Sequence, residues 1–100
     1  MVNHPNRHGA PVIVTTQHRG VFFGYISEYT PGDPIIHLKQ ARCCLSWPAE
    51  QRGVIGLASD GPKRGSRVGP PAPEMELRDI TAVLQCSAGA AKAWESGPWN

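Results

Sequence analysis

The stretch IHLKQARCCLSW, residues 36–47, decides the fold, because its apolar residues change phase once along a strand. They alternate on one phase before the change and on the other after it: Ile36 and Leu38, then Ala41, Cys43, Leu45 and Trp47. Successive side chains of a strand point to opposite faces, so a change of phase requires an extra or misaligned residue. We therefore expect a strand that bends or bulges at Lys39-Gln40.

The same pattern returns in MELRDITAVLQC, residues 75–86, with the change of phase at Arg78-Asp79. Leu38-Lys39-Gln40-Ala41 aligns with Leu77-Arg78-Asp79-Ile80. An internal duplication would explain this repeat. Two strands bent in the same way around a small barrel explain it with fewer assumptions.

Three further apolar stretches predict strands. Residues 12–16 are β-branched throughout, and residues 21–26 mix aromatic and β-branched side chains, which suit a pleated surface. Gly24 within the second stretch predicts a sharp bend or a close backbone approach. Residues 54–58 predict a short apolar strand, and residues 59–73 predict a 15-residue loop without periodicity.

The two ends of the chain differ from its centre. Residues 1–11 are polar and predict a flexible N-terminal arm, and residues 12–100 predict a single small domain. Ser87 is a suitable cap for a helix over about residues 87–96, in which Ala90, Ala91 and Trp94 would dock on the sheet. The absence of crossover helices excludes a parallel sheet. We expect a mainly β protein: a small, strongly bent antiparallel barrel, SH3-like or Sm-like, of five to six strands with a short C-terminal α-helix.

Composition excludes several classes of protein. The 100 residues hold 10 Lys and Arg against 8 Asp and Glu, a net charge of +2, which is too balanced for a non-specific DNA-coating protein. With 40% hydrophobic and 18% charged residues, the chain is too apolar to be wholly disordered. It has no apolar run of membrane-spanning length and no signal-peptide pattern, and its three cysteines fit a reducing compartment. We expect a cytoplasmic protein.

No motif predicts catalysis, a cofactor or a metal site. The four His and three Cys lack the paired spacing of zinc ligands, and Cys43 and Cys86 are expected to fill the core. Pro62 and the spacing around it rule out a phosphate-binding loop at residues 61–66. We therefore predict a protein that is not an enzyme, with a cysteine-dependent enzyme as the weakest alternative.

The candidate binding residues are basic or aromatic. Residues 59–73 carry three of the basic side chains, which can neutralise phosphates or pair with an acidic protein surface, although a solvated loop is the plain alternative. An exposed ring at Phe22, beside Arg19, can stack on a base or anchor a protein. The full candidate set is Arg19, Phe22, Lys63, Arg64, Arg67 and Trp99.

Two resemblances extend this interpretation. Residues 19–26, RGVFFGYI, followed by IIHL at 35–38, resemble the first signature of Sm-like proteins, which implies an Sm-like barrel. In the turn, Gly32-Asp33-Pro34 replaces the Asn with which Sm proteins hold a base, so the RNA pocket is not carried over.

Over residues 12–99 the chain also resembles small uncharacterised proteins of tailed phages and prophages of Gram-negative bacteria. The shared phrases are TQHRGVFFG at 16–24, RGVIGLA at 52–58, RVGP at 67–70, ITAV at 80–83 and AWE at 93–95. This resemblance implies an accessory phage protein in the host cytoplasm. We expect it to engage a host protein, either to inhibit a host defence system or to redirect a host enzyme. The alternative is an Sm-like module that binds RNA or single-stranded DNA. Self-association through an exposed edge strand is a further expectation.

Overall fold

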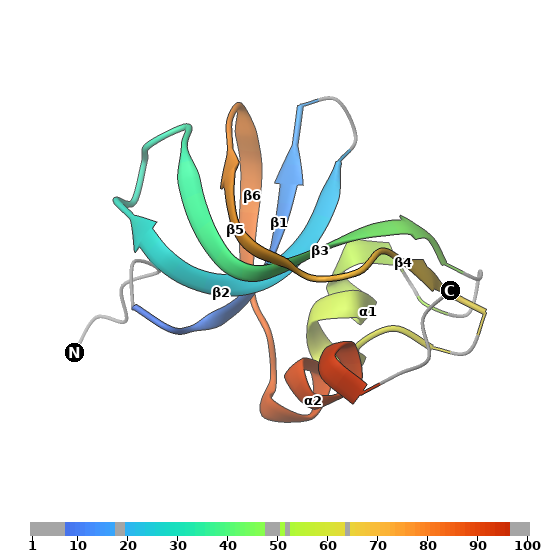
Figure 1. The fold of residues 1–100 in the computed structure, drawn as a ribbon. Helices are drawn as coiled ribbons and strands as arrows, with labels where there is room; N and C mark the ends of the chain where they lie inside the picture. The colour runs from blue at the N-terminus through green and yellow to red at the C-terminus, as the bar shows by residue number, and fades with distance from the viewer. Residues whose placement is uncertain (1–7, 18–19, 48–50, 52, 64, 97–100) are drawn as a thin grey trace.

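The described part of the chain forms one antiparallel sheet of six strands with two short helices packed beside it (Figure 1). The computed structural model describes residues 8–17, 20–47, 51, 53–63 and 65–96. The elements follow one another as β1 (Pro11–Thr16), β2 (Val21–Tyr29), β3 (Ile36–Ser46), α1 (Gly53–Asp60), β4 (Arg67–Val68), β5 (Ala72–Leu77), β6 (Ile80–Gln85) and α2 (Ala88–Ser96).

The strand order shows that the sheet is strongly curled. The order is β4-β3-β2-β1-β6, and β5 also pairs with β3, so that β5 and β6 lie at opposite edges of the sheet. Only Arg78 and Asp79 separate these two strands in sequence. Because two residues cannot span an open five-strand sheet, the sheet must curl until its edges approach at this point. The prediction of a small, strongly bent, mainly β fold with a short C-terminal helix is confirmed.

Both predicted changes of phase coincide with an unusual backbone conformation. Gln40 and Asp79 have φ values of 52° and 55°, the left-handed region that side chains other than glycine rarely enter. Leu38 and Ala41, three residues apart, consequently point into the same cluster of buried residues. The Gln40 site lies inside β3, as expected, whereas the Asp79 site separates β5 from β6.

The central strand β1 is buried on both faces. Val12, Ile13 and Val14 are consecutive and at most 2% exposed, although neighbouring side chains of a strand point to opposite faces. A uniformly β-branched strand is typical of such burial. The inner cluster fills the curl of the sheet and comprises Val12, Val14, Ile26, Ile36, Leu38, Ala41 and Leu77. The helix-side cluster lies beneath α1 and α2 and comprises Ile13, Val21, Phe23, Cys44, Leu57, Ala58, Val68, Cys86, Ala90 and Trp94.

Residues 54–58 form part of helix α1, so the prediction of a strand there was wrong. Leu57 and Ala58 are buried with Val54 packed against the same cluster, whereas Ile55 is 70% exposed. This spacing of three and four residues is helical. A run of five small and apolar residues fits a short strand and a short buried helix equally well in sequence.

The segment after α1 is also more structured than predicted. Residues 67–68 form β4, paired with the end of β3, and β5 begins at Ala72, so the expected loop over 59–73 was too long. Buried Gln51 organises this segment: its side-chain amide donates to the carbonyl of Gly61 and its oxygen accepts from the amide of Lys63.

Helix α2 begins and packs as the sequence predicts. Ser87 Oγ accepts a hydrogen bond from the Ala90 amide at 3.0 Å, which caps the helix. Ala90 and Trp94 are buried against the sheet.

At the other end of the domain, the predicted arm over 1–11 lies mostly outside the described residues. Gly9 and Ala10 already exchange backbone hydrogen bonds with Ile26.

The cysteines divide differently from the prediction. Cys86 is in the core as expected, but its buried companion is Cys44, whereas Cys43 is only half-buried. Across the β2–β3 pair, Cys43 lies opposite Phe22 and Arg42 lies opposite Phe23. Because alternate residues of a strand share a face, Cys44 lies on the same face as Arg42 and Phe23, the face that packs against α2.

Candidate functional site

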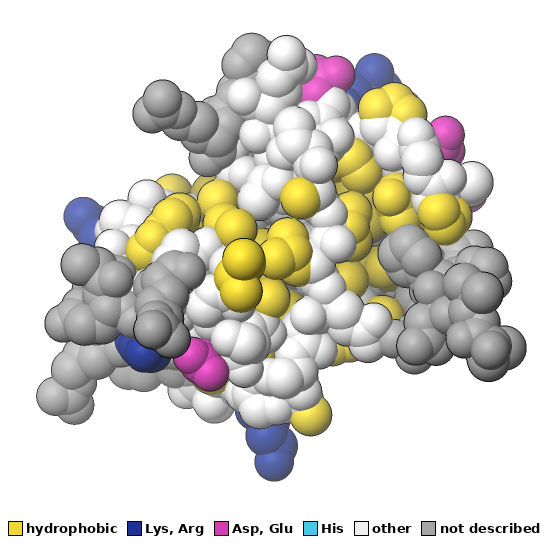
Figure 2. Space-filling view, turned by 180° about the vertical axis from the view of Figure 1, so that it is seen from behind, with side chains coloured by type: hydrophobic (Ala, Val, Ile, Leu, Met, Phe, Trp, Pro, Cys, Tyr) yellow, Lys and Arg dark blue, Asp and Glu magenta, His cyan; other side chains and the backbone are white. Residues whose placement is uncertain are grey.

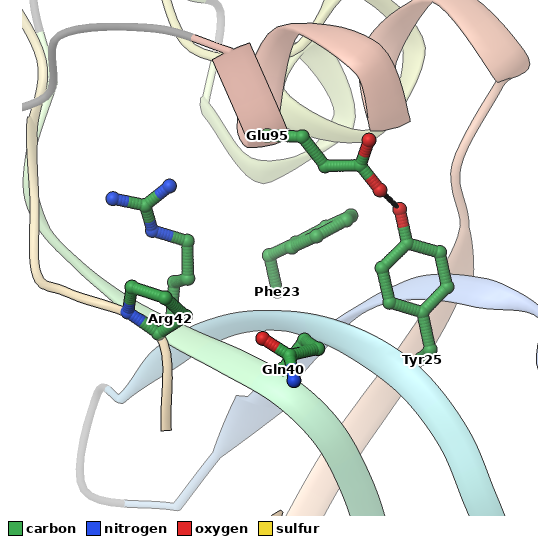
Figure 3. Close-up of a pocket in the computed structure, with 6 residues that line it drawn as sticks. Phe23, Tyr25, Gln40, Arg42 and Glu95 are labelled. Carbon is green, nitrogen blue, oxygen red and sulfur yellow. Dashed lines mark hydrogen bonds between the residues drawn. The ribbon is translucent and has the colours of Figure 1, made fainter. Parts of the chain in front are cut away.

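A pocket of about 240 Å³ opens where the sheet meets the end of α2. Strands β2 and β3, the connection that leads into β5, and helix α2 all contribute to it (Figure 3). Its lining consists of Phe23, Tyr25, Gln40, Arg42, Pro71 and Glu95.

The aromatic part of the pocket is rigidly packed. The Phe23 ring lies parallel to the Trp94 indole, with 5.0 Å between ring centroids and 3° between planes. Tyr25 meets Phe23 edge to face, at 5.3 Å and 79°. Offset-stacked and edge-to-face contacts are the favoured aromatic geometries, so the three rings hold one another in place.

A tyrosine and a carboxylate form one end of the pocket. The Tyr25 hydroxyl donates a hydrogen bond to Glu95 Oε2, which ties β2 to α2 (Figure 3). Burial, with the hydrogen bond to Glu95, raises the pKa of Tyr25 well above its usual value. The phenol therefore stays protonated and remains a donor at any physiological pH.

Arg42 forms the opposite end, across Phe23 from Glu95 (Figure 3). Its Nε donates to the carbonyl of Gly69 at 2.8 Å and its Nη1 donates to the carbonyl of Trp94 at 3.0 Å. These bonds join β3 to the β4–β5 connection and to α2. They fix the guanidinium while leaving its charge uncompensated by either carbonyl, so the pocket has a cationic end and an anionic end.

Gln40 owes its place in the pocket to the bend in β3. Its positive φ lets Leu38 and Ala41 share one face while Gln40 itself remains exposed at the rim. The sequence predicted a bend at this position and nothing more. It missed the pocket, whose lining comes from four separate segments and forms no local motif.

The sequence-predicted binding residues lie elsewhere. Lys63, which follows α1, and Arg67, the first residue of β4, are both exposed. A hydrogen bond from the Ser66 amide to the Lys63 carbonyl turns the chain between them. Phe22 is half-buried and packs against the inner cluster, because both faces of this part of β2 are covered. Arg19, Arg64 and Trp99 lie outside the described residues.

The other chemistry-bearing side chains are dispersed. In the described residues no three His, Cys, Asp or Glu side chains gather as metal ligands would. Burial raises the pKa of Cys44 to about 11 and that of Cys86 to about 12, the opposite of what an activated thiol needs. Neither described helix has the length and apolar character required to cross a membrane.

Comparison with known proteins assigns the chain to a family. A family model described as a domain of unknown function, DUF6948, matches residues 9–94. This range includes both helices except the end of α2, all six strands and every pocket residue but Glu95, and the chain belongs to that family. No curated protein and no solved structure matches it.

Proposed function

We propose that this member of the DUF6948 family acts by binding a protein partner, and that the pocket between Arg42 and Glu95 anchors one side chain of that partner. The observation that carries this proposal is the size and lining of the pocket. Small-molecule and cofactor sites usually occupy about 300–1,000 Å³. A pocket of about 240 Å³ is better suited to a single large side chain.

The chemistry of the lining agrees with such a role. Energetically dominant residues of protein interfaces are enriched in tyrosine, tryptophan and arginine, held in well-packed surroundings. Tyr25 and Arg42 meet that description, because each is fixed by bonds to other elements. The preferred guest is a side chain with an apolar body that rests on the aromatic wall and a polar tip that reaches Arg42 or Glu95.

The partner is proposed to be a host protein in the bacterial cytoplasm, with the chain as a phage-type accessory protein that inhibits a host defence system. The resemblance of residues 12–99 to phage and prophage proteins supports this setting. The small size and the net charge of +2 also suit a protein interface better than a nucleic-acid one.

A second candidate is an Sm-like module that binds RNA or single-stranded DNA. It is favoured by the exposure of Lys63 and Arg67, four residues apart on one segment. Such binding would weaken steeply with rising salt, by a slope set by the number of phosphates contacted. Binding through the mostly uncharged aromatic wall of the pocket would depend much less on the salt concentration.

The test is affinity capture of the tagged full chain from a lysate of a Gram-negative host, with and without nuclease, at low and moderate salt. One dominant host protein retained after nuclease and salt is the expected result. Recovery of nuclease-sensitive material alone would overturn the proposal in favour of the nucleic-acid module.

A further inference from the structure

Within the described residues, strand β6 has one edge without a strand partner. In the described chain it pairs with β1 alone. The Cys86 amide donates to the Pro11 carbonyl, and the register continues through Ile13↔Leu84 and Val14↔Val83. Hydrogen-bonded pairs alternate along an antiparallel ladder. The amide and carbonyl of Val83 therefore point away from β1, toward the open edge.

A groove of about 290 Å³ follows this edge. Ala82 and Val83 both line it, although consecutive side chains of a strand point to opposite faces, so the groove must run along the edge of the strand. The opposite wall is the end of β2 and the following turn, through Tyr29, Gly32 and Asp33. The Ile80 amide donates to the Pro34 carbonyl, which closes one end of the groove.

The two edges of the sheet are protected to very different degrees. β5, at the far edge, carries Pro73, Glu74 and Glu76, and proline and charge on an edge strand prevent strand addition. β6, with the sequence ITAVLQ, has neither a proline nor a charge. The face seen from behind likewise carries a central band of hydrophobic side chains, with its charged side chains at the margins (Figure 2).

We infer that the open edge of β6 accepts an extended segment of a partner protein as an added strand. Main-chain hydrogen bonds would form at Val83, and a side-chain pocket beside the edge gives such interactions their specificity. The groove wall of Tyr29, Ile80 and Val83 selects an apolar side chain at alternate positions. The exposed carboxylate of Asp33, with Glu28 in the adjoining hollow, selects a lysine or arginine next to it.

A second copy of this chain would fill the edge less well. Its own β6, with the sequence ITAVLQ, carries no lysine or arginine that could meet Asp33. The inference rests on the proposal that the protein binds another protein, but it names a different surface from the pocket at Arg42.

The probe is a library of random dodecapeptides displayed on phage and selected on the immobilised full chain. Enriched peptides are expected to alternate apolar residues and to carry a lysine or arginine. Their affinity should fall at least tenfold for Ala82→Lys, which places a charge on the edge, and for Asp33→Lys. Pro73→Lys, at the opposite edge, is the matched control and should bind as the wild type does.

A second measurement guards against a folding defect and against an unrelated site. The bound peptide should slow hydrogen exchange of the Val83 amide in the wild-type protein. The inference is wrong if no enriched peptide depends on Ala82, or if the wild type is a dimer that Ala82→Lys dissociates. If the enriched peptides lose binding only to a pocket variant such as Pro71→Arg, the role of the β6 edge is wrong and the proposed function still stands.

Discussion

Trp94 of α2 lies flat against Phe23 of β2, with 3° between the ring planes and 5.0 Å between centroids. Its indole Nε1 also donates to the carbonyl of Leu57 in α1, at 3.2 Å. One side chain thus holds both helices to the sheet and supports the aromatic wall of the pocket.

Replacing this side chain should be among the most damaging changes to the fold. Because Trp94 is fully buried, Trp94→Ala is expected to reduce the free energy of unfolding by about 3–5 kcal/mol. Trp94→Phe retains a ring against Phe23 and should lose clearly less. Urea denaturation followed by far-UV circular dichroism measures both, and equal losses would show that the stacking contributes nothing.

Gly24 should tolerate no side chain. A Cβ there would lie 2.8 Å from the Cβ of Leu38, because β2 and β3 approach closely at the bend. Gly24→Ala is expected to cost about 1–3 kcal/mol through overpacking. Gly89→Ala, in helix α2, should instead stabilise by about 0.5–1 kcal/mol, because the new Cβ would meet no described atom beyond the neighbouring backbone of its own helix within 4 Å. Equal effects of the two substitutions in chemical denaturation would contradict this assignment.

The bends were predictable because they leave a mark in the sequence. A change of hydrophobic phase arises where a strand bulges or where one strand gives way to the next. Gln40 has a positive φ inside β3, and Asp79 has one between β5 and β6. Likewise, the β-branched run of β1 reflects burial on both faces. By contrast, the apolar run at 54–58 lacks a decisive period, and tertiary packing against α2 makes it helical.

The pocket was not predictable for a different reason. Tyr25, Arg42 and Glu95 meet only when the sheet has curled and α2 has docked, and no spacing along the chain reports that encounter. The exposed charges of Lys63 and Arg67 were easier to notice, although they lie outside the pocket.

Gln51 should be essential for the segment between α1 and β4. It is fully buried and satisfies the Gly61 carbonyl and the Lys63 amide, so Gln51→Leu leaves both backbone groups without these bonds. Each buried group left unsatisfied costs about 1–3 kcal/mol. Hydrogen exchange at the Lys63 amide should quicken in the variant. Unchanged stability and exchange would show that Gln51 is dispensable.

Glu76 should make stability depend on acid pH. Hydrogen bonds from Arg78 at 2.6 Å and with His37 at 3.0 Å lower the pKa of its carboxyl. A lowered pKa in the folded state contributes stability above the unfolded value, about 4.3 for glutamate, and that contribution is lost as pH falls through the folded value. At pH 7 the wild-type protein should therefore have a higher urea midpoint of unfolding than Glu76→Gln.

The difference between these two proteins should shrink as the pH falls below about 4.3 toward pH 3. Glu74→Gln is the control, because Glu74 lies exposed on the same strand and no hydrogen bond or ion pair of its side chain is found in the described residues. A difference between wild type and Glu76→Gln that persists unchanged at pH 3 would contradict the assignment.

The three thiols should differ in reactivity. Burial raises the pKa of Cys43 as well, but Cys43 is only half-buried, whereas Cys44 and Cys86 are buried. Iodoacetamide at pH 8 should therefore modify Cys43 first in the folded protein and reach the others only after unfolding. Mass spectrometry of the digested protein identifies the sites. Rapid modification of Cys86 under native conditions would revive the cysteine-enzyme alternative.

The central claim is that the pocket between Arg42 and Glu95 holds a partner side chain. Its most direct test compares Pro71→Arg, which places a long side chain on the pocket rim, with Pro70→Arg at the adjacent exposed proline outside the lining. Quantitative capture from host lysate should lose its dominant protein at least tenfold with Pro71→Arg and retain it with Pro70→Arg. Equal retention by both variants would contradict the claim.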